Sequence, residues 1–226
     1  MKLAPEEFIA KIAPIACKLR CEGSPIFPSV RIAQAAHETG WTIHPWNNLV
    51  GYKVGSGNPN AYWKGQCVST KTWEVYDGVR YDNVQAVWRA YDTLEDGFRD
   101  QDLLFGISRY DRVRAAASPE EQAYALFVCG YATDPKYAEK IISLIQRYGL
   151  RQYDRLAEEE EEAMREEIEQ LRRQVEQMKG LMAMDIPDWA KPAVDAAVKA
   201  GLVTEPNGGS YDFYRILVVM HRKGLF

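Results

Sequence analysis

The sequence predicts a mainly α-helical protein of the α+β class, with a helical body that carries a small β-hairpin. Apolar residues recur at helical spacing from about residue 5 to 40 and again from about 93 to 148. Between them, β-branched and aromatic residues flank Asp77-Gly78, which is typical of a tight hairpin turn. A charged helix then follows, and after it a compact helical hairpin. The 226 residues are therefore expected to form three parts, residues 1–152, 153–184 and 185–226.

The first predicted helix opens the chain behind Pro5, with two glutamates in its first turn. Its apolar face is formed by Phe8, Ile12, Ile15 and Leu19. The second predicted helix begins near Pro28, which suits a first turn, and stops at Gly40, which can adopt the left-handed conformation.

Glu38 lies in the last turn of this second helix. The negative end of the helix dipole and partial burial both disfavour the ionised carboxylate, so Glu38 is expected to keep its proton to higher pH. A general acid needs such a shift. The alternative is a surface glutamate at a helix end, which position alone does not exclude.

The remaining elements of the helical body follow in order. Residues from about 66 to 91 are expected to form the hairpin or a small meander. Three helices are then predicted: about 93–105, Pro119–Val128 behind a capping box, and Pro135–Tyr148 behind Asp134, which is expected to be an N-cap rather than a catalyst. A helical body with a small β-lobe resembles the lysozyme-like arrangement, in which a cleft lies between the two.

Composition excludes several function classes. The net charge of −4 argues against a mainly nucleic-acid-binding protein. The sequence contains no run of about 18 apolar residues, so membrane insertion is not expected. The first residues lack the apolar core of a secretory signal, so the protein is expected to be made in the cytoplasm and to reach its substrate after release.

No metal or other cofactor is expected. The cysteines show no paired spacing and the histidines are scattered, which makes a zinc site improbable. These residues are Cys17, Cys21, Cys67, Cys129, His37, His44 and His221.

Five short blocks occur in an order that identifies a family resemblance. They are His-Glu-Thr-Gly-Trp (37–41), Asn-Asn-Leu-Val-Gly-Tyr-Lys (47–53), Thr-Trp-Glu (72–74), Trp-Arg-Ala-Tyr-Asp (88–92) and Gly-Tyr-Ala-Thr-Asp-Pro-Lys-Tyr (130–137). Residues from about 5 to 150 resemble the glucosaminidase domain of bacterial autolysins, flagellar peptidoglycan hydrolases and phage endolysins, glycoside hydrolase family 73. Thr39 and Val50 depart mildly from the family pattern.

The resemblance implies hydrolysis of peptidoglycan glycan strands at the β-1,4 bond after N-acetylglucosamine, with Glu38 as general acid. It also makes Glu74 the candidate base on the hairpin, although Glu74 can equally be an exposed strand carboxylate. Tyr131 matches a family tyrosine suited to orienting the substrate's 2-acetamido group. Its alternative is a loop tyrosine packed between helices.

Sugar binding calls for flat apolar faces flanked by amide and hydroxyl groups, because a pyranose ring has an apolar face and a polar rim. Six residues near Glu38 supply such groups and are the predicted substrate-binding set: Trp41, Trp46, Asn47, Asn48, Tyr52 and Tyr137. Each aromatic residue can instead belong to the core, and for Trp88 the core is favoured.

Residues 153–184 show a heptad pattern. With Ile168 at position a, the a positions are Glu161, Ile168, Val175 and Met182, and the d positions are Ala157, Met164, Leu171 and Met178. Glu160 with Arg165, Glu167 with Arg172 and Gln174 with Lys179 occupy g and the following e. This pattern favours a parallel homodimer, with a trimer as the alternative oligomer and a single solvated linker helix as the third interpretation.

Residues 185–226 resemble a single surface-layer-homology motif, with Asp-Ile-Pro-Asp-Trp-Ala (185–190), a Gly201 stop and an Asn-Gly-Gly turn. Such modules bind cell-wall polymers but usually occur in threes, so this segment can instead cap an oligomer. Together these features predict a peptidoglycan glycosidase of phage or prophage origin. The alternatives are an N-acetylmuramidase, a lytic transglycosylase and a catalytically silent wall-binding protein.

Overall fold

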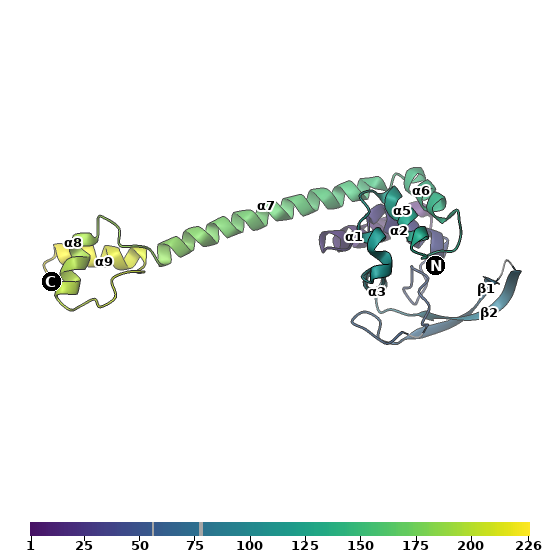
Figure 1. Cartoon of the computed structure of the whole chain (residues 1–226), viewed down its shortest axis with the longest axis horizontal. Helices are drawn as coiled ribbons and strands as arrows, with labels where there is room; N and C mark the ends of the chain where they lie inside the picture. Colours follow the sequence, from purple (N-terminus) through teal and green to yellow (C-terminus); the bar gives the residue numbers. More distant parts are fainter. Residues whose placement is uncertain (56, 77–78) are drawn as a thin grey trace. The chain divides into compact units, whose positions relative to one another are not determined.

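The computed structural model describes residues 1–55, 57–76 and 79–226, and the side chains of residues 72–82 lie outside this description. Contacts divide the chain into two compact units, Met1–Glu161 and Glu162–Phe226. The predicted mainly helical class with one small antiparallel hairpin is confirmed (Figure 1). The three-part division at residues 152 and 184 stays a prediction.

The first unit is a helical body with a hairpin. Residues 108–114 form short helical segments that the sequence pattern did not predict. The elements are α1 (Pro5–Cys21), α2 (Pro28–Thr39), β1 (Cys67–Tyr76), β2 (Val79–Arg89), α3 (Leu94–Phe105), η1 (Ser108–Tyr110), α4 (Asp111–Arg114), α5 (Pro119–Val128) and α6 (Tyr137–Arg147).

Helix α2 forms the centre of the body. Its residues from Pro28 to Ala36 are all buried, and it packs against α1, α5 and α6. The helix ends as predicted, because Gly40 adopts the left-handed conformation with φ +57°. A rigid, fully enclosed helix therefore carries Glu38 out to the edge of the core.

The hairpin pairs β1 with β2 in antiparallel register, with an irregularity between Thr72 and Glu74. The predicted turn at Asp77-Gly78 lies outside the described residues. An isolated bridge between Lys53 and Trp88 joins the loop after α2 to β2. The hairpin projects from the helical body in Figure 1. Contacts at the end of the hairpin nearest the body therefore fix its position.

A buried carboxylate on α3 anchors that base. Asp100 is 1% exposed and forms an ion pair with the buried Arg89 at the end of β2. Three side chains donate hydrogen bonds of 2.7 Å to it, from Arg89 Nη1, Tyr91 Oη and Asn60 Nδ2. One residue thus connects α3 to three points of the hairpin and of the loop before it.

Helix α6 starts two residues later than predicted. Asp134 was expected to be the N-cap, but its carboxylate accepts a hydrogen bond from the Lys136 amide at 2.9 Å. Its carbonyl accepts from the Tyr137 amide. Asp134 therefore caps the turn that precedes α6, and the helix itself begins at Tyr137.

The first turns of α7 (Arg151–Met182) pack on the first unit. The Asp154 carboxylate accepts a hydrogen bond of 2.8 Å from the Ser29 amide, and Cys17 Sγ donates to the Tyr153 carbonyl. Ala157, expected at a d position of the heptad seam, is 0% exposed. Part of the predicted seam is therefore already covered, and the seam that another chain can reach starts later.

The second unit contains the rest of α7, then α8 (Lys191–Lys199) and α9 (Tyr211–Arg222), which pack on each other. The Tyr214 hydroxyl links three backbone segments, since it accepts from the Gly209 amide and lies 2.7 Å from the Pro206 carbonyl, to which it donates, and 3.2 Å from the Met184 carbonyl. The small core comprises Ala190, Val194, Ala197, Tyr214 and Leu217. A search of the described residues for a bilayer-spanning helix finds none.

Candidate active site

Glu38 is exposed to solvent where α2 ends, and the walls of a cleft surround its carboxyl. Loss of surrounding water raises the pKa of this carboxyl to about 7. A hydrogen bond from the Tyr137 hydroxyl opposes the shift, because it stabilises the carboxylate. Near neutral pH a large share of Glu38 is protonated, as a general acid requires.

A buried network holds Tyr137 against Glu38. Gln34, which is 0% exposed on α2, donates a hydrogen bond of 2.9 Å to the Tyr137 hydroxyl. The hydroxyl hydrogen is then left for the Glu38 carboxylate. Tyr137 is only 2% exposed, so little of its ring faces the cleft, and its role in binding sugar stays a prediction.

Glu38 lies at the junction of two cavities. The first, here the Trp46 cavity, has a volume of about 380 Å³. It is lined by Glu38, Thr39, His44, Trp46, Asn48, Gly51, Thr70, Lys71 and Trp88. The second, here the Tyr131 cavity, has about 290 Å³. It is lined by Glu38, Val50, Gly51, Tyr52, Lys53, Gln101, Leu104, Tyr110 and Tyr131. The two cavities share Glu38 and Gly51 in their lining and are together called the cleft below.

Gly51, like Glu38, lines both cavities. Its φ of +63° is a conformation that side chains rarely adopt, and a Cβ there would lie 3.3 Å from Glu38 Oε2. The missing side chain keeps the space beside the carboxyl open.

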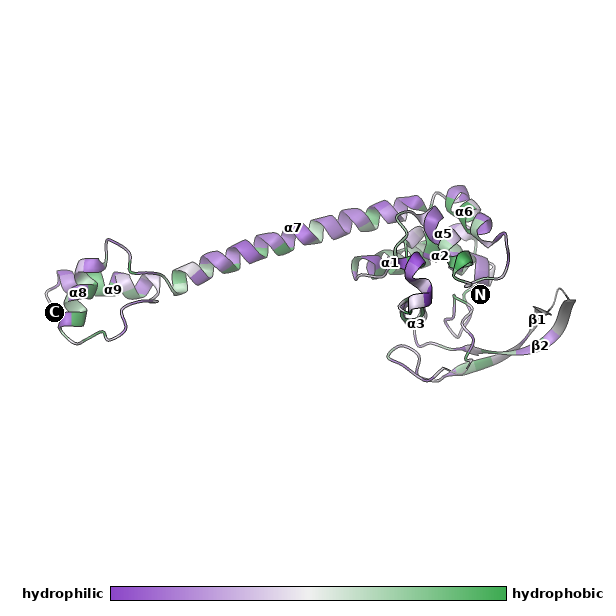
Figure 2. Cartoon of the chain, viewed as in Figure 1, coloured by the Kyte–Doolittle hydropathy of each residue, from purple (hydrophilic) through white to green (hydrophobic). Residues whose placement is uncertain are grey.

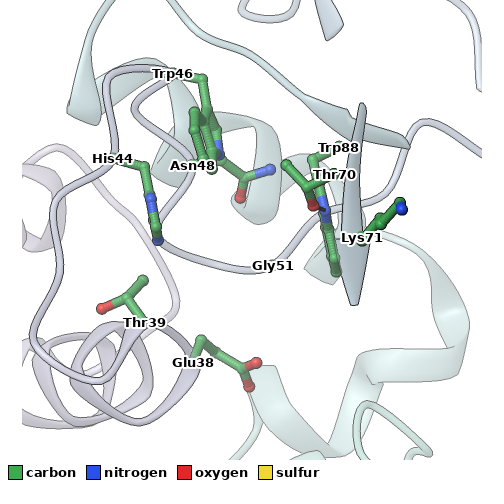
Figure 3. A pocket seen from close by; sticks show the side chains of 9 residues that line it. All are labelled: Glu38, Thr39, His44, Trp46, Asn48, Gly51, Thr70, Lys71 and Trp88. Carbon is green, nitrogen blue, oxygen red and sulfur yellow. Dashed lines mark hydrogen bonds between the residues drawn. The ribbon is translucent and has the colours of Figure 1, made fainter. Parts of the chain in front are cut away.

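Aromatic rings line the Trp46 cavity from two sides (Figure 3). Trp46 stacks on His44 with ring centroids 4.3 Å apart. Trp88, on the hairpin, donates from Nε1 to Thr70 Oγ1 at 2.8 Å. Trp88 was expected in the core, but strand pairing brings it to the cavity wall beside Thr70.

The two neighbouring asparagines have structural contacts. Asn48 is 4% exposed, and its amide group donates to the Tyr52 and Arg89 carbonyls and accepts from the Tyr52 amide. Asn47 has φ +55° and donates to the Tyr91 and Asp92 carbonyls. The Asn47 amide thus holds the loop to the chain after β2, and the role of Asn47 in sugar binding stays a prediction. Asn48 borders the Trp46 cavity with its polar atoms already bonded.

Trp41 lies away from both cavities. Its ring packs edge-on against Phe8 at 5.6 Å and Tyr148 at 4.9 Å. It lines neither cavity, and its role in substrate binding stays a prediction. Among the predicted binding residues, Trp46 and Tyr52 are the aromatic side chains that line the cleft.

Tyr131 and Tyr52 form part of the Tyr131 cavity. Burial raises the pKa of the Tyr131 phenol well above its usual value, so the hydroxyl stays protonated. The Arg89 guanidinium lies between the rings of Tyr52 and Trp63, 4.1 and 4.2 Å from their centroids. This stacking fixes Tyr52 at the cleft.

Glu74 belongs to β1, opposite Tyr81. Its side chain lies outside the described residues, so its role as a base stays a prediction.

Several cleft residues were not predicted: Thr39, His44, Thr70, Lys71, Gln101 and Tyr110. His44 stands two residues before Trp46, and this close spacing of two rings was the one signal available for it. Within the described part of the chain, no three His, Cys, Asp or Glu side chains cluster as a metal site requires.

Comparisons with known proteins agree with this geometry. The glucosaminidase family model, described as mannosyl-glycoprotein endo-beta-N-acetylglucosaminidase, matches residues 16–150. The chain is 38% identical over 139 residues to exo-glucosaminidase LytG of Bacillus subtilis (strain 168), covering 57% of this chain and 46% of that protein. The chain thus spans just under half the length of this relative.

Two solved structures are similar to the helical body and hairpin. A peptidoglycan hydrolase mutant from Sphingomonas sp. A1 has a TM-score of 0.55 and 33% identity, over 66% of this chain and 97% of that one. The catalytic domain of the autolysin Auto from Listeria monocytogenes has a TM-score of 0.55 and 31% identity, over 66% of this chain and 86% of that one. The fold is therefore lysozyme-like, and the chain belongs to the glucosaminidase family of glycoside hydrolases.

Proposed function

We propose that the protein is a peptidoglycan hydrolase that cleaves the β-1,4 bond after N-acetylglucosamine within glycan strands, with Glu38 as general acid. The observation that carries this proposal is the Glu38 carboxyl, whose pKa is raised to about 7, at the junction of two cavities. The peptidoglycan hydrolase and autolysin named above support the choice of substrate. Because Glu38 lines both cavities, the proposal is cleavage within a chain.

In the proposed reaction, Glu38 donates its proton to the glycosidic oxygen as the bond to the anomeric carbon breaks. The opposite face of the sugar is assigned to Glu74 as a base that activates water, or to Tyr131 as a group that orients the 2-acetamido carbonyl for attack. Water activation by Glu74 inverts the anomeric configuration, and acetamide attack retains it. The two routes therefore give different products.

The experiment uses purified cell walls and the whole chain. Fall in turbidity with release of fragments that end in reducing N-acetylglucosamine supports the proposal. Fragments that end in reducing N-acetylmuramic acid identify a muramidase, and anhydro ends identify a lytic transglycosylase. A protein that binds walls but releases nothing is a silent binding protein.

The activity should fall as pH rises through about 7, because Glu38 must be protonated to act. Tyr137→Phe removes a hydrogen bond that stabilises the carboxylate and holds the Glu38 pKa down. The alkaline limb of kcat/KM is therefore expected at higher pH in this variant. Kinetics on soluble glycan strands between pH 5 and 9 measure the shift.

Tyr124→Phe is the matched control for this profile, since Tyr124 is an exposed tyrosine on α5 that lines neither cavity. It should leave the alkaline limb in place. A limb that is unchanged or shifted to lower pH in Tyr137→Phe contradicts the assignment of Glu38.

We further propose that α7 pairs with α7 of a second copy as a parallel coiled coil. Six apolar residues recur at a and d positions and are 44–70% exposed: Met164, Ile168, Leu171, Val175, Met178 and Met182 (Figure 2). Within its own helix Arg172 pairs with Glu169 and Lys179 with Glu176. These intrahelical pairs are the competing arrangement of a single helix.

Sedimentation at micromolar concentration should show twice the chain mass of 25.8 kDa. Leu171→Lys with Val175→Lys places two charges in the seam and should give monomers. Gln170→Lys with Gln177→Lys adds the same charges at outer c positions and should keep the dimer. A wild-type monomer refutes the pairing, and a threefold mass shows a trimer instead.

Residues 185–226 are proposed to hold a secondary cell-wall polymer. Trp189 and Tyr211 form an edge-on pair 5.7 Å apart, and they are 46% and 40% exposed. Exposed aromatic rings of this kind can pack on the apolar face of a sugar.

A further inference from the structure

A buried hydrogen-bond chain fixes the direction of one amide beside the cleft. Arg31 Nη1 lies 3.2 Å from Gln101 Oε1. A guanidinium can only donate, so the Gln101 atom that faces it must be the oxygen. The Gln101 nitrogen therefore faces Tyr131, whose hydroxyl oxygen is 3.0 Å away.

The arginine that orients this amide is itself held. Its side chain is 0% exposed, and Nη2 donates to Asp102 and to Ser24 Oγ at 2.7 Å. Nη1 also donates to the Phe98 carbonyl at 3.3 Å. Because Arg31 bonds both α3 and Ser24 in the loop between α1 and α2, these contacts hold the guanidinium against Gln101.

The direction of the Tyr131 hydroxyl follows. Since Tyr131 accepts a hydrogen bond from Gln101, its own hydrogen must point to another acceptor. The Val50 carbonyl oxygen, 3.1 Å away, is that acceptor. A phenol oxygen has two lone pairs, and one is left after the bond from Gln101. Tyr131 lines the same cavity as Glu38, so this lone pair is what the hydroxyl offers a ligand there.

A lone pair calls for a donor on the substrate. The 2-acetamido group of the sugar carries one N–H, and a hydrogen bond from that N–H leaves more electron density on the acetamide oxygen. This oxygen forms the bond to the anomeric carbon as the glycosidic bond breaks and its electron pair takes the proton from Glu38. The N–H proton stays on nitrogen. Water then attacks the anomeric carbon, breaks its new bond to the acetamide oxygen and gives a proton to the Glu38 carboxylate.

We propose that Gln101, oriented by Arg31, is a positioning residue that turns the Tyr131 hydroxyl so that it accepts the N–H of the substrate's 2-acetamido group. This inference rests on the proposed glycosidase function and selects the acetamide route within it. Gln101 is proposed to act only through Tyr131. Its substitution should therefore have no further effect on kcat once Tyr131 is replaced, whereas a loss of general support for the fold would.

Kinetics on soluble peptidoglycan strands test the coupling. Tyr131→Phe and Gln101→Leu should each lower kcat by about tenfold with little change in KM, as the loss of one transition-state hydrogen bond implies. The double variant should lose no more than Tyr131→Phe alone. If the loss of kcat in the double variant equals the product of the two single losses, the proposal is overturned.

Two further variants guard against effects of folding. Gln101→Glu is isosteric and still pairs with Arg31, but it can only accept from Tyr131, so it should also lower kcat. Gln122→Leu removes another fully buried glutamine with hydrogen bonds to Pro25, Val113 and Phe27. Being remote from the cleft, it should keep the wild-type kcat. A Gln101→Glu variant with wild-type kcat overturns the proposal.

The substrate provides the last test. In an analogue with a 2-O-acetyl group, an ester oxygen replaces the N–H, so wild-type enzyme should lose about tenfold more kcat on it than Tyr131→Phe does. Equal losses in both enzymes show that the hydroxyl meets another group, and overturn the inference while leaving the glycosidase in place. A wild-type enzyme that releases no fragments from natural strands refutes the proposed function itself.

Discussion

Glu38→Gln is expected to lower kcat for wall lysis by about 10²–10⁴-fold, the range that general acid catalysis contributes. The amide has nearly the shape of the carboxyl but no proton to give to the leaving oxygen. Binding to walls should persist, because the rings of Trp46 and Trp88 and the cavity walls are unchanged. Turbidity loss and wall pull-down, measured on the same preparation, separate the two effects.

The change in stability that Glu38→Gln causes at alkaline pH can be predicted in direction. The folded-state pKa of Glu38 is raised from 4.5 to about 7, so the wild-type protein loses stability as pH rises through that window. Glutamine does not ionise, so Glu38→Gln should be at least as stable as wild type at pH 8. Glu139→Gln, at an exposed site on α6, is the control and should keep lysis. Near-wild-type lysis by Glu38→Gln would show that another group is the acid.

Asp100→Ala is expected to lower the free energy of unfolding by about 3–5 kcal/mol, the usual effect of removing one partner of a buried ion pair. Arg89 would be left as a buried charge without its carboxylate, and Tyr91 and Asn60 would each lose an acceptor. Thermal unfolding followed by tryptophan fluorescence should show a Tm lower by roughly 10 °C.

The matched control is Asp111→Ala, which removes the 65% exposed partner of Arg114. An exposed ion pair contributes about 0–1 kcal/mol, so this variant should unfold close to wild type. If Asp100→Ala loses no more stability than Asp111→Ala, the anchoring role of Asp100 is refuted. Lysis below the melting range should also fall in Asp100→Ala, because the hairpin carries one wall of the cleft.

Helix α2, which carries Glu38, could be predicted because its signals are local. Pro28 and Gly40 define the ends of α2 through their own backbone preferences, and the position of Glu38 in the last turn follows from them. The hairpin was equally legible from alternation along β1 and β2. Each of these elements depends on residues close together in the sequence.

The directions of single side chains could not be predicted. Trp88 reaches the cleft because of its register with Val68 and its hydrogen bond to Thr70, and alternation along each strand predicts the hairpin but not this register. Tyr137 matched a family motif, but a motif gives position and not exposure. Asn47 looked like a sugar ligand by residue type, although its amide bonds the backbone at residues 91–92.

The burial of Asp100 and Gln101 could not be predicted from the sequence for a related reason. Asp100 and Gln101 stand in a helix rich in charged residues, a pattern that normally indicates a solvent-facing surface. Their partners Arg89 and Arg31 come from β2 and α2, so burial becomes acceptable only after the fold brings the opposite groups together. Arg31 and Gln101 are 70 residues apart in the sequence, and Arg89 and Asp100, although 11 apart, belong to a strand and a helix whose packing the local pattern does not give.

The position of Gly51 and Glu38 in the lining of both cavities has a consequence for how digestion would end, if the proposed function holds. A strand would have to occupy both the Trp46 cavity and the Tyr131 cavity to place a bond beside Glu38. A fragment that fills only one cavity would gain fewer contacts and would leave before it reacts. Degradation would then be self-limiting, with a smallest fragment size, and short products would compete weakly with the intact polymer.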